Sequence, residues 1–169
     1  MSPASMPLVR IPVGVVVARR KAASQWIDFT WTPVAVLDGV PEAKAWQVLH
    51  EDGDTTTFYA GSAEIELYRS ETPYYQENLA SGGASLWVVT TGADDDPLRL
   101  VAVTADPAEG ESFAETAANQ VEQLPMPPQV ESIVASFIAE HHVERDFVKR
   151  KRDRAEPEAL ARRNPEQRK

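Results

Sequence analysis

The run from Ile11 to Ala18, IPVGVVVA, constrains the fold of this chain more than any other segment. Its residues are almost all apolar and largely β-branched, a composition that favours an extended strand. Because no polar residue alternates with the apolar ones, both faces of the strand must be covered, which predicts a central strand. Gly14 within the run predicts a bulge or a close approach of another segment. Residues 1–9 before it are expected to form a flexible N-terminus.

Further segments carry the apolar or alternating pattern of strands. Two pairs of them flank short turns, EDGD at residues 51–54 and GADDDP at residues 92–97, and each pair predicts a β-hairpin. The predicted strands after the first are Trp31–Leu37, Ala45–His50, Thr55–Ala60, Glu64–Tyr68, Leu86–Thr91 and Leu98–Thr104.

Helices are predicted mainly in the second half of the chain. Residues 113–124 are rich in Ala, Glu and Gln, and Ser112 with Glu115 fits a capping box, so a helix is expected there. Pro127 and Pro128 then open a second helix. That helix has an apolar stripe at spacings of three and four, formed by Val130, Ile133, Val134, Phe137, Ile138 and His141. A single helical turn is expected between Tyr74 and Ala80.

These patterns predict one α+β domain over residues 10–148. We expect a mainly antiparallel sheet of six to seven strands, barrel-like or sandwich-like, with C-terminal helices packed on it. A chain of 169 residues is long enough to bury a substantial core. No segment approaches the roughly 20 apolar residues of a membrane span, and Arg19-Arg20-Lys21 follows the first apolar run where a signal peptide would have a cleavage site. The expected location is therefore the cytoplasm.

Charge is distributed unevenly along the chain. Residues 1–140 carry 7 Lys/Arg against 20 Asp/Glu, a net of −13, whereas residues 141–169 carry 10 against 6, a net of +4. The prediction is an acidic body followed by a basic C-terminal arm over residues 149–169, partly disordered. An acidic body repels nucleic acid, so any polyanion would have to bind the arm alone.

Several chemistries are excluded or disfavoured by composition. The chain has no cysteine, which rules out disulfides, thiolate ligands, iron–sulfur ligation and cysteine nucleophiles. His141 and His142 are adjacent, so on a helix their side chains diverge by about 100° and do not form a metal-binding pair. No catalytic, phosphate-binding or dinucleotide motif occurs. We therefore expect a protein without catalytic residues, metal or cofactor.

Two groups of residues remain as candidates for binding. The basic run Lys149–Arg152 next to Phe147 can contact phosphates or acidic side chains, although Lys and Arg at a helix C-terminus also simply complement the helix dipole. Trp26, Phe29 and Trp31 form an aromatic cluster near the N-terminus, a pattern more typical of core or rim packing than of a ligand cage.

Three blocks of the chain resemble, in order, the signature blocks of a bacterial family known as domain of unknown function 3305. The blocks are VGVVVARRKAASQWIDFTWTPVAVL, FYAGSAEIELYRSETPYYQENLAS and HHVERDFVKRKRDRAEPEALARR. Members are typically encoded beside genes of molybdenum- or tungsten-dependent formate dehydrogenase. The resemblance therefore implies an accessory role in the assembly, cofactor loading or regulation of that enzyme.

The matching blocks contain residues that folding explains least, and these are the predicted contacts with a protein partner, a formate dehydrogenase subunit or its maturation factor. They are Arg19, Arg20, Trp26, Trp31, Glu71, Tyr75, Asn78, Phe147, Lys149, Arg150, Lys151 and Arg152. Three alternatives stay open. The protein could be a small subunit of the mature enzyme, a nucleic-acid or nucleotide-binding regulator that uses the basic arm, or an enzyme with an unrecognised site.

Overall fold

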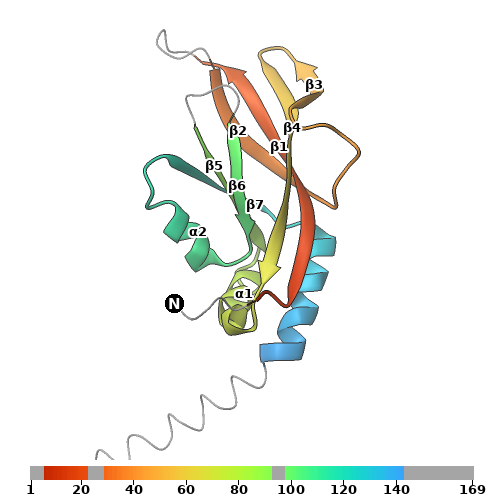
Figure 1. The fold of residues 1–169 in the computed structure, drawn as a ribbon, viewed down its shortest axis with the longest axis vertical. Helices are drawn as coiled ribbons and strands as arrows, with labels where there is room; N and C mark the ends of the chain where they lie inside the picture. The colour runs from red at the N-terminus through yellow and green to blue at the C-terminus, as the bar shows by residue number, and fades with distance from the viewer. Residues whose placement is uncertain (1–5, 23–28, 93–97, 143–169) are drawn as a thin grey trace, which may run out of the picture.

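The computed structural model describes residues 6–22, 29–92 and 98–142. These residues form two antiparallel sheets and three α-helices, an α+β fold (Figure 1). One sheet has four strands in the order β2-β1-β4-β3, and the other has three in the order β6-β5-β7. The strands are β1 (Val9–Lys21), β2 (Phe29–Asp38), β3 (Gln47–Asp52), β4 (Thr55–Leu67), β5 (Ser85–Thr91), β6 (Arg99–Thr104) and β7 (Asn119–Pro125).

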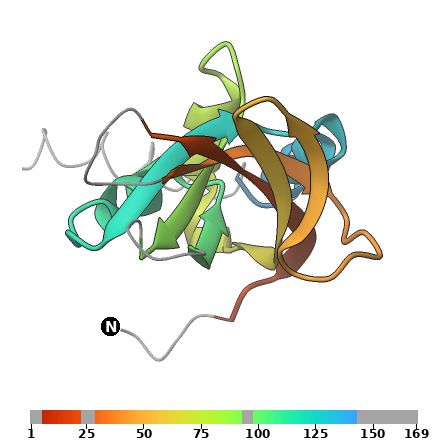
Figure 2. The same cartoon turned by 90° about the horizontal axis from the view of Figure 1, so that it is seen from above.

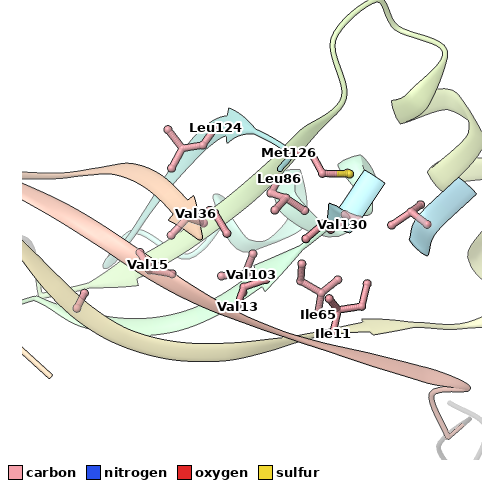
Figure 3. Close-up of a cluster of buried hydrophobic side chains, with 14 of the residues drawn as sticks. Ile11, Val13, Val15, Val36, Ile65, Leu86, Val103, Leu124, Met126 and Val130 are labelled. Carbon is pink, nitrogen blue, oxygen red and sulfur yellow. The ribbon is translucent and has the colours of Figure 1, made fainter. Parts of the chain in front are cut away.

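β1 is the predicted central strand, and its position is confirmed. It pairs with β2 on one side and with β4 on the other. Val13, Val15 and Val17 have no exposed surface, and they lie on one face because strand side chains alternate. Figure 3 shows Val13 and Val15 pointing into a cluster with side chains of the other sheet, among them Leu86 and Val103. The core therefore lies between the two sheets.

Gly14 is a site of close approach, as expected. A Cβ there would lie 2.9 Å from Cε1 of Tyr59 and 3.2 Å from Cδ of Pro41. The irregularities in register fall beside it, between Val15 and Val16 opposite β4 and between Val16 and Val17 opposite β2.

β4 joins two segments that the sequence pattern had separated. The residues predicted as strands at 55–60 and 64–68 belong, except for Tyr68, to one strand of 13 residues. The two segments meet at Gly61, whose φ of 127° is unfavourable for residues other than glycine. Ala60 before it has no partner residue on β1, which marks a β-bulge. β3 pairs with β4 only as far as Tyr59. The edge of β4 beyond Tyr59 is thus left without a partner strand in this sheet.

The arrangement of the sheets bears on one expectation. A mainly antiparallel sheet of six to seven strands, barrel-like or sandwich-like, was predicted; the described residues form seven strands in two antiparallel sheets, which do not close into a barrel. The sheets come together where β4 lies beside β6 and where β2 lies beside β7. Between β2 and β7 the side-chain amide of Gln120 donates to the backbone carbonyl of Trp31 at 3.4 Å. The sheets are therefore held chiefly by the side chains packed between them.

The helix predicted over residues 113–124 is wrong. The structure has helix α2 (Pro107–Phe113), followed by β7. Asp106 caps α2 by accepting from the backbone N–H groups of Ala108 and Glu109 at 2.9 and 3.3 Å. β7 then pairs with β5 over the whole length of β5. A long-range strand pairing therefore outweighs the helical composition of this segment.

The other helices agree with the sequence pattern. α1 (Thr72–Leu79) covers the predicted helical turn, and residues 128–142 are helical. Val130, Val134 and Phe137 of the latter helix are buried in the common core, whereas Ile133 is 39% exposed. The apolar stripe thus packs this helix against the core, with Ile133 at its margin.

Gly110 in α2 allows the helix to lie directly on Trp87 of β5. A Cβ at this position would be 2.6 Å from Cγ and 2.9 Å from Cβ of Trp87, atoms of the side-chain stem that cannot swing away. Gly110→Ala is expected to lower the free energy of unfolding by about 1–3 kcal/mol, although alanine normally stabilises a helix. Denaturant unfolding measures the change. Gly83→Ala is the matched control, because a Cβ added there would meet no atom within 4 Å; equal stability of the two variants would contradict the packing described.

Candidate protein-binding surface

Four aromatic side chains gather on the face of the first sheet that continues the core. Trp31 of β2 lies 5.7 Å from Trp46 and 5.6 Å from Phe58 of β4, measured between ring centroids, and Trp46 lies 6.0 Å from Phe58. Trp31 and Phe58 are 6% and 8% exposed, whereas Trp46 and Phe29 are only half-buried. The group therefore has a buried base and a partly exposed rim.

Arg19 lies over these rings. It stands opposite Trp31 in the β1–β2 register, so the two side chains share a face of the sheet. Its guanidinium carbon is 4.4 Å from the ring centre of Phe29, 5.1 Å from that of Phe58 and 5.6 Å from that of Trp31. These distances allow cation–π attraction. We call the five residues Arg19, Phe29, Trp31, Trp46 and Phe58 the Arg19 aromatic cluster.

The backbone of Trp46 has an unusual conformation. Its φ of 68° lies in the left-handed region, and among the described residues it is the only non-glycine residue there. Its N–H donates to the carbonyl of Tyr59 on β4, which fixes the segment before β3 beside the sheet. Such a conformation costs about 1–2 kcal/mol in an L-residue. The contacts of the ring with Trp31 and Phe58 offset this cost.

Exposed apolar residues continue from this cluster onto the neighbouring hairpin. All six residues of β3 are exposed, and Val48 and Leu49 show 46% and 45% of their surface. Val48 stands opposite Phe58 in the register. Arginine and large aromatic residues are the types enriched in the centres of protein interfaces. The cluster thus closes one end of the core and also presents a surface suited to a protein partner.

The structure brings together only part of the predicted contact set. Arg19 and Trp31 meet in the cluster, and Arg20 is exposed on the next position of β1. Trp26, Phe147 and Lys149–Arg152 lie outside the described residues. Trp46 and Phe58 join the cluster although they were not among the predicted contacts. The hairpin predicted around residues 51–54 was the signal that could have placed the segment before β3 beside Phe58 of β4.

Tyr75 and Asn78 on α1 are buried, with 1% and 3% of their surface exposed. The hydroxyl of Tyr75 accepts from the backbone N–H of Tyr68 at 2.9 Å, and its ring contacts that of Phe137 edge-on. Burial raises the pKa of Tyr75 above its ordinary value. Glu71, which precedes α1, is half-buried and accepts from the hydroxyl of Ser70 at 2.9 Å.

Asn78 connects three segments through its side-chain amide. The amide nitrogen donates to the carbonyls of Ser85 and Ala105 at 2.8 and 3.0 Å, and the amide oxygen accepts from the N–H of Ser85 at 3.0 Å. α1 is thereby fixed to the start of β5 and to the chain just after β6. Asn78 and Tyr75 therefore hold the fold together, whatever else they contact.

Asn78→Ala is expected to lower the free energy of unfolding by about 2–4 kcal/mol, because buried backbone groups lose their partners. Thermal or denaturant unfolding measures the loss. Gln76→Ala on the exposed face of the same helix should change stability by less than about 0.5 kcal/mol. A change at Asn78 no larger than that at Gln76 would contradict the structural role.

A groove of about 390 Å³ lies where β4 runs beside β6. Glu64, Glu66 and Glu109 line it together with Tyr68 and residues 100–104 of β6. Arg10 is 3.7 Å from Glu64 and 3.8 Å from Glu66, and the Thr104 hydroxyl donates to Glu109 at 2.6 Å. We call this feature the acidic groove, because three carboxylates lie along it with one nearby guanidinium.

Tyr68 donates a hydrogen bond to Glu66 at the groove, and this bond, with smaller contributions from desolvation and nearby carboxylates, raises the pKa of Tyr68 to about 12. Glu66→Gln should lower this pKa toward 10.0, because a neutral amide does not favour the protonated phenol as an anion does. The pKa of Tyr68 is measured by pH titration of tyrosinate absorbance. The titration of the same protein with Tyr68→Phe is subtracted, so that only Tyr68 contributes to the difference. The stabilisation from this bond is present below pH 10 and lost as the pH rises through about 12. Glu64→Gln is the control; an equal effect there would contradict the assignment.

The two adjacent histidines have separate neighbours. The ring of His141 lies 4.5 Å from that of Phe137, and Nδ1 of His142 lies 3.2 Å from the Thr72 hydroxyl. In the described part of the chain, no three His, Asp or Glu side chains come together in an arrangement that could hold a metal ion. No helix among residues 6–22, 29–92 and 98–142 is both long and apolar enough to cross a membrane.

Comparison with known proteins gives a family but no characterised relative. Neither the curated proteins nor the solved structures include a match to this chain. The family model described as "Protein of unknown function (DUF3305)" matches residues 12–151, which include the Arg19 aromatic cluster and every described helix and strand except the first three residues of β1. The chain therefore belongs to the DUF3305 family.

Proposed function

We propose that this protein is a non-catalytic accessory protein that binds a component of a formate dehydrogenase in the cytoplasm, during assembly, cofactor loading or regulation of that enzyme. Family membership supports the proposal through the gene neighbourhood that the resemblance implies. The structural observation that carries it is the Arg19 aromatic cluster, a group of rings with a buried base and a partly exposed rim, which lies under a guanidinium and next to the exposed Val48 and Leu49.

The chemistry of this cluster suits binding better than catalysis. Aromatic rings and a guanidinium do not exchange protons near neutral pH, so they offer no general acid or base there. They do offer apolar area, a fixed positive charge and a flat stacking surface, which together favour a protein partner with an acidic or carbonyl-rich contact. A small subunit that stays bound to the mature enzyme could use the same surface. Such a subunit would differ from a maturation factor in remaining bound to active enzyme at a fixed stoichiometry, and not in the contacts it makes.

The use of the basic arm for nucleic acid receives no support from the described residues. Exposed carboxylates line β4 and the turn of the first hairpin, and they would repel a phosphate backbone that approached the body. We therefore place the primary contact on the cluster and not on the arm.

Affinity capture tests the proposal. The tagged full chain is recovered from its own host grown with formate and molybdate, and the eluate is analysed by mass spectrometry and by formate dehydrogenase assay. Inactive or cofactor-free enzyme in the eluate would identify a maturation factor. Active enzyme at fixed stoichiometry would identify a subunit instead, and recovery of no formate dehydrogenase component would refute both.

Arg19→Ala is expected to reduce recovery of the formate dehydrogenase component by at least about tenfold, the scale of a central arginine in an interface. Arg19→Lys keeps the positive charge but loses the planar guanidinium that stacks on the rings, so recovery of the formate dehydrogenase component should fall by less than with Arg19→Ala. Arg99→Ala is the control, because Arg99 is an exposed arginine on β6 of the other sheet. Melting temperatures show whether each variant is folded; a folded Arg19→Ala protein that captures as much enzyme as wild type would exclude the cluster as the contact.

A further inference from the structure

The acidic groove runs along two strand edges. β6 is the outer strand of its sheet, and β4 has no partner on this side beyond Tyr59. The lining includes consecutive residues, 62–64 of β4 and 100–104 of β6. Consecutive residues point to opposite faces of a sheet, so a cavity that meets all of them follows the edges of the strands and not a face. Such a groove offers backbone hydrogen-bonding groups as well as side chains.

The chain after residue 142 leaves the described structure close to this groove. Nδ1 of His142, the last described residue, lies 3.2 Å from Oγ1 of Thr72. Thr72 follows a short 3₁₀ turn, Arg69–Glu71, which begins directly after Tyr68, and Tyr68 lines the groove. Lys149 is seven positions after His142, and seven extended residue steps span about 23 Å. The basic run is therefore within reach of the groove in the same molecule.

Charge favours the same pairing. Glu64 and Glu66 share Arg10 at 3.7 and 3.8 Å, so one guanidinium faces two carboxylates, and Glu109 adds a third. Residues 149–152 are Lys-Arg-Lys-Arg. The exposed Val101, with 45% of its surface accessible, also lines the groove, and it is an apolar contact for the stem of a long basic side chain.

We propose that the acidic groove between β4 and β6 binds the basic segment Lys149–Arg152 of the same chain. The segment lies extended along the two strand edges, and its side chains pair with Glu64, Glu66 and Glu109. In this bound form the arm is not available to an acidic partner or to a polyanion, so a competitor for the groove or for the arm would release it. This proposal does not depend on the role in formate dehydrogenase assembly.

Limited digestion of the full chain with trypsin tests this assignment, because trypsin cleaves after Lys and Arg. Mass spectrometry gives the rate of cleavage within residues 149–152. At low salt we expect cleavage about tenfold slower than in a synthetic peptide of residues 143–169, from several exposed ion pairs acting together. The protection should disappear at high salt, where exposed charges are screened. Equal rates for the chain and the peptide at low salt would overturn the proposal without any variant.

A charge-neutralised protein, Glu64→Gln with Glu66→Gln and Glu109→Gln, should be cleaved in the basic segment at the rate of the peptide. A matched triple variant, Glu42→Gln with Glu51→Gln and Glu131→Gln, removes as many exposed carboxylates elsewhere and should retain the protection. Wild-type protection in the groove variant would overturn the assignment. Protection that increases with protein concentration would place the segment in the groove of a second copy and would overturn binding within one chain.

Discussion

The burial of β1 between two partner strands is the constraint on which the rest of this structure depends. A strand that hydrogen-bonds on both edges can expose only its faces, and one face of β1 carries Val13, Val15 and Val17, none of which has exposed surface. The burial of each such side chain is worth about 1.5–3 kcal/mol, which is available only if a second layer covers that face. The three-stranded sheet and the helix over residues 128–142 supply this layer. In Figure 2, β7 of one sheet crosses β1 of the other at an angle.

The end of this buried face determines the character of the surface beyond it. After Val17 the same face continues with Arg19, where the second sheet no longer covers β1 fully. Aromatic rings fill the place of aliphatic side chains there, and a guanidinium lies on them. The Arg19 aromatic cluster thus lies at the margin of the core. The stacking of the guanidinium on the rings stabilises the cluster and also makes it a suitable surface for a partner.

Local patterns predicted most of the strands, because each is determined by its own alternation or by its neighbour across a short turn. The central position of β1, both hairpins and α1 were confirmed in this way. The sequence left a barrel-like and a sandwich-like arrangement open, because the order of the strands depends on segments that meet only in the fold. β7 was mistaken for helix because its composition favours helix while its pairing with β5 is a long-range interaction. The candidate site was predicted in part: Arg19 and Trp31 are neighbours across β1 and β2, but Trp46 arrives from a loop whose left-handed backbone no periodicity reveals.

The first hairpin has a consequence for work with this protein. β3 and the start of β4 form a hairpin with its turn at Gly53, whose φ is 62°. No residue of β3 belongs to the core between the sheets. In Figure 1 this turn and the helix over residues 128–142 lie toward opposite ends of the molecule. A short epitope or a reporter peptide inserted after Gly53 would extend into solvent and leave the packing between the sheets unchanged. The chain therefore has an internal labelling point in the first hairpin, away from the helix over residues 128–142.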